Sequence, residues 1–358
     1  MMIGGSAAHD CARPGLAMTE RENFLRALEF RGPEWIPVTA AILDAAWIRH
    51  REGLEDIVLH HPRLFGERDR GEIDFDQILA DHQEYERDAW GCLWHHLEPG
   101  LLGQSVEHPL ADWGALEALE VPDPLDEDWA QIEDDIRSDA EQGLPIRGGL
   151  GCCLMDTLIA LRGFDNAMAD FATDSPELCR LLDVLLDYNM KRVERWLSIG
   201  VDVMFFHSDI GTQRGPMMSP THFRKHLKPV YRALFTACRN AGSHVFYSSD
   251  GNLLEIVDDL IECGVSLHDP QVRANTLEGI VVAYKGRMCT KVDLDQQVIL
   301  PSGTPRQVGA HVREVVEAMD SPEGGLMIYA EIHPTYPLAN ISALCEALER
   351  YCLAGKRE

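Results

Sequence analysis

The chain has 358 residues, 45% of them hydrophobic, and a formal net charge of −27. This length and apolar content suffice for one large barrel or two average domains with a substantial core. Nucleic acid and anionic membrane surfaces are not expected as partners, because binding phosphate requires clustered Lys and Arg. We therefore expect the partner to be a small molecule or another protein.

Targeting signals and disulfide patterns are not evident in the sequence. The ten cysteines are scattered without C-x-x-C spacing, which predicts reduced thiols and a cytoplasmic protein. No apolar run approaches the ~20 residues of a membrane span, and residues 1–17 lack the basic start and apolar middle of a signal peptide. Met18 is a more natural start than Met1. We therefore expect a loose extension at 1–17 and a single domain over 18–358.

Helical and strand patterns alternate along the rest of the chain. Thr19 and Glu22 have the spacing of a capping box at the start of a helix over 19–30. The acidic stretch 73–96 is predicted to be an irregular excursion that could contain a further strand. Short runs rich in β-branched and aromatic residues predict seven strands, at 35–43, 144–150, 201–207, 244–248, 265–269, 288–293 and 325–331.

Helices between most of these strands favour a closed barrel. The prediction is an α/β fold, a distorted (β/α)8 TIM barrel with a helical and irregular excursion near its N-terminus. No G-x-G-x-x-G follows the first strand, and no G-x-x-x-x-G-K-[ST] occurs. A nucleotide-binding fold is therefore not supported.

Polar residues recur at the ends of the predicted strands. Parallel strands end at one rim, so the side chains that follow them converge on one pocket. Any single acid there is equally well explained as a helix cap, but the collective pattern predicts an active site. The residues concerned are Asp44, His207, Asp209, Ser248, Asp250, His268, Asp269, Asp293, Asp295, Glu331 and His333. Gln213 and Arg214 precede Gly215 and Pro216, which predicts a loop that presents both side chains inward.

The chain resembles the uroporphyrinogen decarboxylase superfamily, and more its corrinoid-linked methyltransferase and O-demethylase branch than the porphyrin decarboxylases. The resemblance covers roughly residues 18–355. It implies a distorted TIM barrel with its site at the C-terminal mouth, and a homodimer. The stretches that carry it are TERENFLRALEFRGPEWIPV from Thr19, DAWGCLW at 88–94, LRGFDNAMADFATDSPEL at 161–178, DIGTQRGPMMSP at 209–220, SDGNLLEIVDDLIECGVSLHDPQ at 249–271, KVDLDQQVILPSGTPRQV at 291–308 and HPTYPLANISAL at 333–344.

Departures from the family pattern bear on the chemistry. Porphyrin decarboxylases of the family carry an Arg-rich segment where this chain has AAILDAAWIRHR at 40–51, so porphyrin decarboxylation is not expected. The zinc methyltransferases use a His-x-Cys pair and a later Cys, at positions matched here by Ser248, Asp250 and Ala330 or Glu331. The standard zinc site is therefore absent. A different metal site is the alternative, built from His207, Asp209, His268, Glu331 and His333.

The resemblance implies a methyltransferase that demethylates a small substrate, such as a methoxylated aromatic, and passes the methyl group to a corrinoid (cobalamin) on a partner protein. A buried acid would protonate the leaving group. The candidate catalytic residues are Asp209, Asp250, Asp293, Glu331 and His333. The candidate substrate-binding residues are Trp94, Met155, His207, Gln213, Arg214, His268 and Tyr336, although such aromatic residues equally suit a core.

Two alternatives remain open. A decarboxylase or other lyase acting on a small carboxylic acid would use a basic residue in the pocket, for which Arg147, Arg214 and Lys291 are available. A catalytically silent barrel would account for the missing thiolates, and strongly perturbed rim carboxylates would argue against it.

Overall fold

The computed structural model describes residues 18–354, so the expected extension at 1–17 lies outside the described residues. A seven-stranded parallel sheet runs in the order β1-β10-β9-β8-β7-β6-β5. Its strands are β1 (Val38–Ile42), β5 (Arg147–Cys152), β6 (Val203–His207), β7 (His244–Ser248), β8 (Leu267–His268), β9 (Cys289–Asp293) and β10 (Leu326–Ile332). Each overlaps with one of the seven predicted strands, and β7 has the predicted bounds.

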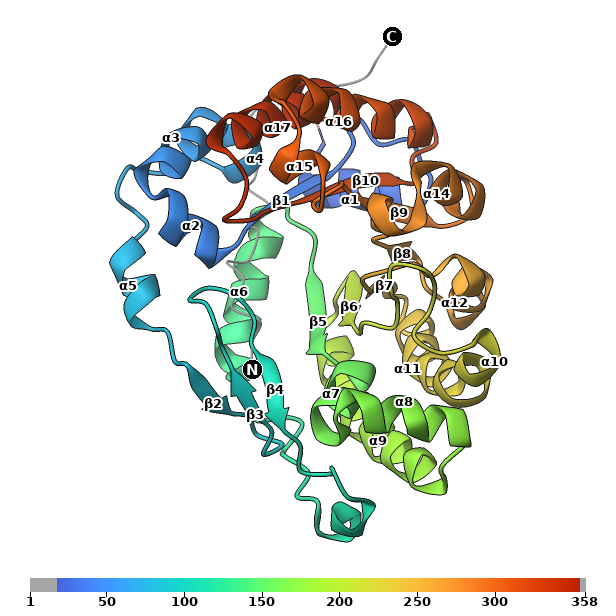
Figure 1. Cartoon of the computed structure of the whole chain (residues 1–358). Coiled ribbons are helices and arrows are strands. Elements are labelled where there is room, and N and C mark those ends of the chain that lie inside the picture. The colour runs from blue at the N-terminus through green and yellow to red at the C-terminus, as the bar shows by residue number, and fades with distance from the viewer. Residues whose placement is uncertain (1–17, 355–358) are drawn as a thin grey trace.

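The sheet curls into a TIM-barrel-like fold whose two edge strands are β1 and β5 (Figure 1). Segment 73–96 was predicted to contain a further strand, but it does not supply an eighth strand of the barrel. That segment forms β2 (Tyr85–Arg87) and β3 (Leu93–His95), which pair with β4 (Gln104–Glu107) in a separate antiparallel sheet. Antiparallel strands can pair through a short turn, which residues 88–92 provide, whereas a parallel partner in the barrel requires a long crossover.

Helices follow most strands and cover the outside of the curled sheet (Figure 1). The longest are α9 (Pro176–Ile199), α16 (Pro305–Met319), α17 (Leu338–Tyr351), α6 (Trp129–Glu141) and α11 (Lys228–Asn240). The others are α1 (Glu20–Leu28), α2 (Asp44–His50), α3 (Glu52–His60), α4 (Pro62–Phe65), α5 (Phe75–Ala80), α7 (Leu154–Arg162), α8 (Phe164–Thr173), α10 (Pro220–His222), α12 (Val257–Cys263), α13 (Val272–Asn275), α14 (Leu277–Tyr284) and α15 (Ile299–Ser302). Over 18–354, none of them is long and apolar enough to cross a membrane.

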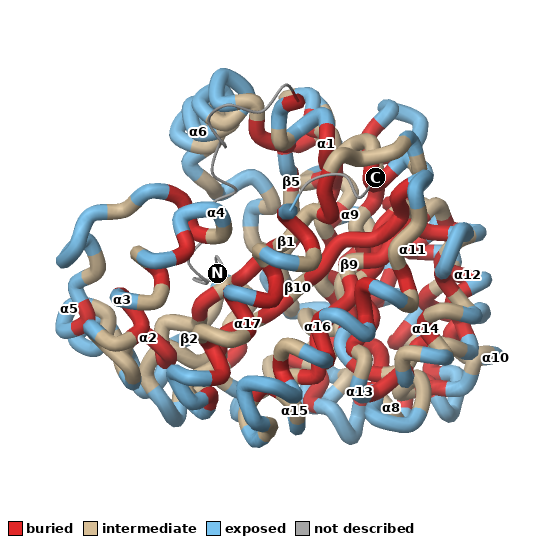
Figure 2. The backbone as a smooth tube through the Cα atoms, turned by 90° about the horizontal axis from the view of Figure 1, so that it is seen from above, coloured by how far each residue is buried: buried red, intermediate tan, exposed pale blue. Residues whose placement is uncertain are grey.

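The core lies between the strands and these helices, and Figure 2 shows buried backbone along β1, β10 and β9. A smaller cluster lies near the start of the strands, where Phe24 and Leu28 of α1 pack on Leu267 and Met327. Helix α1 has half of the predicted capping box: the Thr19 side chain accepts a hydrogen bond from the backbone N–H of Glu22, while the Glu22 side chain accepts from Arg26. The opposite end of the strands, which α1 leaves uncovered, carries the predicted polar residues.

Candidate active site at the barrel mouth

Four acidic or imidazole groups meet at the ends of β5, β6 and β7. Asp209 follows β6, and its Oδ1 accepts a hydrogen bond of 2.7 Å from the backbone N–H of Asp250, which follows β7. His207 ends β6, with Nε2 3.8 Å from Asp209 Oδ1. Asp156, in the first turn of α7 after β5, accepts a hydrogen bond from the backbone N–H of Asp209 at 3.4 Å. These side chains therefore form one cluster.

A hydrogen-bonded chain extends this cluster to β8. Ser248 Oγ donates to Asp269 Oδ2 at 2.7 Å, and His207 Nδ1 lies 3.4 Å from the same Ser248 oxygen. Gln271 donates from Nε2 to Asp250 Oδ1 at 2.9 Å, and its Oε1 accepts from the backbone N–H of Gly251. The loop after β7 is thus held by groups from both neighbouring strands.

A second chain joins β9 to β10. Gln296 Nε2 donates to Asp293 Oδ2 at 3.0 Å, and Gln296 Oε1 lies 3.0 Å from His333 Nε2. The same His333 nitrogen is 2.9 Å from Glu331 Oε2, while the Tyr329 hydroxyl donates to Glu331 Oε1 at 2.8 Å. The structure therefore brings all five predicted catalytic residues to the mouth, in two adjoining networks.

Burial and mutual repulsion favour the protonated form of several mouth carboxyls. Burial raises the pKa of Asp250 to about 6, with the charge of Asp209 adding to the effect. The pKa of Asp293 is raised well above its usual range, by burial first and then by the charges of Asp250 and Asp269. Burial likewise raises the pKa of Asp269, and that of Asp156 to about 7. Carboxyls that stay protonated near neutral pH can act as proton donors.

Two other groups are shifted toward their charged forms. Burial alone would lower the pKa of His207, but the surrounding carboxylates outweigh it and the pKa is raised. Burial would raise the pKa of Glu331, but hydrogen bonds from His333 and Tyr329 outweigh it and the pKa is lowered. The mouth thus holds neutral acids beside an ionised carboxylate, an arrangement that separates acid and base roles.

The predicted substrate-binding residues other than His207 and Tyr336 are dispersed. Met155 and His268 are fully buried, and the His268 ring stacks between those of Tyr247 and Tyr284. Burial lowers the pKa of His268 to about 3. This position does not fit direct contact with a substrate. It also removes His268 from the metal-ligand set proposed from the sequence.

The indole of Trp94 and the hydroxyl of Tyr336 both donate hydrogen bonds within the fold. Trp94 lies on β3 and donates from Nε1 to Asp88. Tyr336 is buried beside His333, with ring centroids 5.4 Å apart, so it does line the second network.

Gln213 and Arg214 are exposed in the loop after β6, so the expectation that both side chains point inward is wrong. In this loop the backbone N–H of Thr212 donates to the carbonyl of Gly215, which closes a turn around Gln213 and Arg214.

Several residues of the two networks were not among the predicted catalytic or substrate-binding residues, namely Asp156, Ser248, Asp269, Gln271, Gln296 and Tyr329. Asp156 follows β5 in a helical pattern, where its carboxylate resembles an ordinary acid of a first helical turn. Gln296 has no charge to draw attention to it. Asp269 could have been preferred to His268, because adjacent strand residues face opposite sides and only one can face the mouth.

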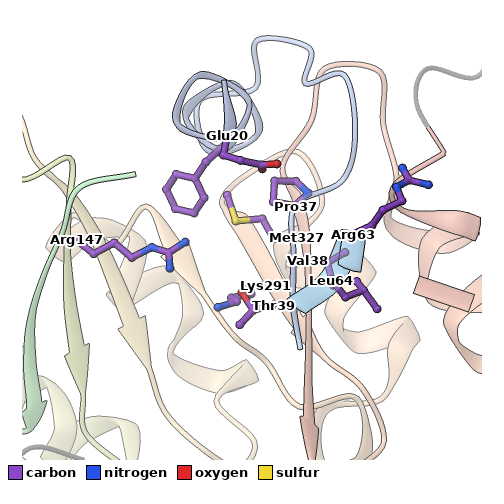
Figure 3. Close-up of a pocket in the computed structure, with 10 residues that line it drawn as sticks. Glu20, Pro37, Val38, Thr39, Arg63, Leu64, Arg147, Lys291 and Met327 are labelled. Carbon is purple, nitrogen blue, oxygen red and sulfur yellow. The ribbon is translucent and has the colours of Figure 1, made fainter. Parts of the chain in front are cut away.

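Two of the basic residues considered for a lyase line a cavity away from the two networks. Arg147 is the first residue of β5 and Lys291 the third of β9, and both line a small cavity near the start of the strands (Figure 3). Arg63 and Glu20 line the same cavity. Lys291 also lies over the Phe246 ring, 5.4 Å from its centroid. Arg147 therefore lies away from the mouth, whereas Lys291 also has its Nζ 5.1 Å from the ring centroid of Tyr329, and its charge partly offsets the rise in the pKa of Asp269.

The donor set at the mouth does not fit the thiolate zinc site of the family. Ser248 occupies one expected ligand position and already donates to Asp269. Among residues 18–354 whose side chains are described, one group of three or more His, Cys, Asp or Glu has the spacing of a metal site, and it contains no cysteine. That group is Asp156, His207 and Asp209.

Comparison with solved structures supports the fold. A methyltransferase from Methanosarcina mazei superposes with a TM-score of 0.63 at 20% identity, covering 93% of this chain and 99% of that one. A sugar phosphate isomerase/epimerase from Parabacteroides distasonis gives 0.33 at 13% identity, covering 61% of this chain and 74% of that one. A D-psicose 3-epimerase gives 0.37 at 9% identity, covering 63% and 84%. The last two scores are too low to bear on function.

No curated protein matches the chain. The family model for uroporphyrinogen decarboxylase (URO-D) matches residues 98–351, well over half of the sequence. That stretch contains β5 to β10 and every residue of the two networks at the mouth. The chain belongs to the uroporphyrinogen decarboxylase (URO-D) family.

Proposed function

We propose that this chain is a methyltransferase that removes a methyl group from a small substrate, such as a methoxylated aromatic, and passes it to a corrinoid on a partner protein. The observation that carries the proposal is the state of Asp293. Its carboxyl is buried, its pKa is strongly raised, and its Oδ1 has no hydrogen-bond partner within 18–354. A protonated Oδ1 would be a buried donor without an acceptor, which a substrate oxygen or nitrogen would satisfy.

A methyl ether or methylamine is a poor methyl donor until its leaving atom is protonated. Asp293 would donate its proton to that atom as the bond to the methyl carbon breaks. Gln296 holds the other carboxyl oxygen, and Glu331, hydrogen-bonded to His333, remains ionised nearby. The corrinoid, when docked, accepts the methyl group. A proton from solvent would then restore the neutral form of Asp293.

Apolar surface beside the mouth supports a protein partner. Leu97 and Leu102 are 73% and 70% exposed. They flank Gly100, whose carbonyl accepts a hydrogen bond from the backbone N–H of Ala45, just beyond β1. Close packing of Gly100 on Asp44 fixes this segment at the end of β1. Exposed leucines at this place would suit a partner that delivers a corrinoid to the mouth.

The alternative functions have weaker support. A carboxylic acid substrate would meet the carboxylates of the mouth, whereas Arg147 and Lys291 line a cavity near the start of the strands. A catalytically silent barrel has no need for neutral acids at the mouth, since burying such groups without function only costs stability. The perturbed carboxyls therefore favour an active enzyme.

The proposal is tested by mixing the enzyme with methoxylated aromatics or methylamines and reduced cobalamin in place of the partner, under anaerobic conditions. The demethylated product is followed by chromatography. We expect turnover by the wild type and a loss of roughly 10²- to 10⁴-fold for Asp293→Asn, the usual range for removing a general acid. The asparagine can still accept the Gln296 hydrogen bond, so the fold should persist.

Arg214→Gln is a matched control for the lyase alternative, because Arg214 is exposed in the loop after β6. It should leave demethylation unchanged. Release of carbon dioxide from small carboxylic acids, without product from any methyl donor, would refute the methyltransferase proposal. Equal demethylation by wild type and Asp293→Asn would refute the role of Asp293.

A further inference from the structure

We propose that Asp156, His207 and Asp209 form a binding site for a divalent metal ion at the mouth. Each offers one ligand atom, and the three atoms lie within 4.8 Å of one another. Two ligand atoms about 2.1 Å from one ion are at most about 4.2 Å apart, so a small closure would suffice. The three residues come from α7, from β6 and from the loop after β6, whereas the positions that match the family's zinc ligands lie on or just after β7 and on β10.

The hydrogen bonds around His207 prepare one nitrogen as a ligand. Ser248 Oγ has one proton, which it donates to Asp269 at 2.7 Å. The same oxygen must therefore accept from His207 Nδ1, 3.4 Å away, which makes Nδ1 the protonated nitrogen of the neutral ring. Nε2 then points its lone pair toward Asp209 and the cluster. Without an ion, a proton on Nε2 would make the ring a cation 3.8 Å from Asp209 Oδ1, and a metal ion would take the place of that positive charge.

Within residues 18–354, an unpartnered oxygen of Asp156 is a second observation that favours a cation at this site. Its Oδ1 accepts from the backbone N–H of Asp209, which orients the carboxylate. Its Oδ2 is buried and has no hydrogen-bond partner among the described residues. A buried carboxylate oxygen without a partner is costly, and a cation shared with Asp209 and His207 would satisfy it.

The donor set indicates the class of ion. Two carboxylates and one imidazole without a thiolate suit Zn²⁺, Mn²⁺, Fe²⁺ or Co²⁺ bound with open positions. Open positions are typical of catalytic rather than structural sites. The role of the ion rests on the proposed function: it would bind the substrate's leaving oxygen. That oxygen keeps the electron pair of the broken carbon–oxygen bond and accepts the proton of Asp293, while the reduced corrinoid supplies the pair for the new bond to the methyl group.

Metal binding can be tested without any assay of activity. The full chain is stripped with chelator and titrated anaerobically with Co²⁺, followed by the visible absorption of the bound ion and by equilibrium dialysis with elemental analysis. We expect one equivalent for the wild type. Asp156→Asn and Asp209→Asn should each weaken binding by more than about 100-fold, since even partners of ligands contribute about 10- to 100-fold.

Glu331→Gln is the matched control, because Glu331 is also a carboxylate of the mouth but belongs to the second network. It should bind Co²⁺ as the wild type does. Absence of binding by the wild type at submillimolar free Co²⁺ would overturn the proposal, as would binding that survives Asp156→Asn or is lost in Glu331→Gln. Binding with the expected pattern but no demethylation would leave the metal site standing and count against the proposed function alone.

Discussion

The backbone N–H of Asp250 donates a 2.7 Å hydrogen bond to Oδ1 of Asp209, so the loops after two neighbouring strands are joined directly at the mouth. The backbones of these two loops come even closer at Gly251, the next residue. A Cβ on Gly251 would lie 2.4 Å from the carbonyl carbon of Gly211. Glycine at both positions is what allows the two carboxylates to share one site.

Gly251→Ala should therefore disturb both stability and catalysis. Gly251 has φ +88°, and an alanine there must also push away the backbone of Gly211. We expect a loss of at least about 2 kcal/mol in unfolding free energy and a larger relative loss of methyl transfer, because the Asp209–Asp250 contact opens. Chemical denaturation and the cobalamin assay measure the two effects.

Gly242→Ala separates backbone strain from the contact. Gly242 has a similar φ of +83°, but a Cβ added to it would meet nothing within 4 Å. It should lose about 1 kcal/mol, the cost of the left-handed conformation, and keep its activity. Equal effects of the two substitutions on activity would show that the close approach of the loops is unimportant.

Sequence patterns were sufficient to predict the barrel strands but not the whole architecture. Residues 244–248 have the β-branched and aromatic composition of a strand, and β7 has these very bounds. Residues 85–95 show equally short apolar runs, yet they pair with each other. Local pattern identifies a strand, whereas its partner depends on the length of the connection and on contacts distant in sequence.

The site was predictable in outline for a related reason. Parallel strands place their C-terminal residues at one rim, so Asp209, Asp250 and Asp293 could be grouped from the sequence alone. The side that each residue faces was harder to predict. His268 ends β8 and Asp269 follows it directly, and the structure turns Asp269 toward Ser248 and His268 toward the tyrosines.

The raised pKa of Asp250 predicts a stability that depends on pH. Its pKa is about 6 in the folded state against 3.8 as the ordinary value, so the folded protein holds this proton more tightly than the unfolded chain. The resulting stabilisation is present below pH 3.8 and is lost as the pH rises through about 6. The Asp250→Asn variant lacks this titrating group. The unfolding free energy of the variant minus that of wild type should therefore be about 1–3 kcal/mol more positive at pH 8 than at pH 4.

Urea denaturation of the two proteins at both pH values measures this difference. Asp183→Asn is the control, since Asp183 is an exposed acid on α9. It should show the same difference from wild type at both pH values. A stabilisation by Asp250→Asn that does not grow between pH 4 and pH 8 would contradict the prediction.

His268 should make the protein sensitive to acid. Its pKa falls from 6.5 to about 3 on folding, because the ring is fully buried. The unfolded chain therefore gains a proton below pH 6.5 that the folded chain does not accept, and stability falls between pH 6.5 and about 3. His268→Phe keeps a ring between Tyr247 and Tyr284 and removes this effect.

The measured quantity is the change in the stability difference between variant and wild type from pH 8 to pH 5. The unfolding free energy of His268→Phe minus that of wild type should be up to about 2 kcal/mol more positive at pH 5 than at pH 8. Any packing cost of the larger ring is the same at both pH values and cancels. A difference that stays constant would mean that His268 is protonated in the folded protein or has a polar partner.

The exposed leucines beside the mouth yield a prediction about the partner. Leu97 and Leu102 lie on either side of Gly100, at the end of β1, and both are largely exposed. A glutamate at Leu102 would place a charge in the contact with a corrinoid-carrying protein without disturbing the core. We expect Leu102→Glu to raise the KM for the protein-bound corrinoid about tenfold or more, while turnover with free cobalamin stays unchanged.

Val282→Glu is the matched control, because Val282 is 75% exposed on α14, which packs on α16 and η3 (Leu254–Ile256) rather than beside Gly100. If Leu102→Glu slowed the reaction with free cobalamin as much as with the protein-bound corrinoid, Leu102 would act on the mouth itself, and the apolar surface around Gly100 would not be the docking site.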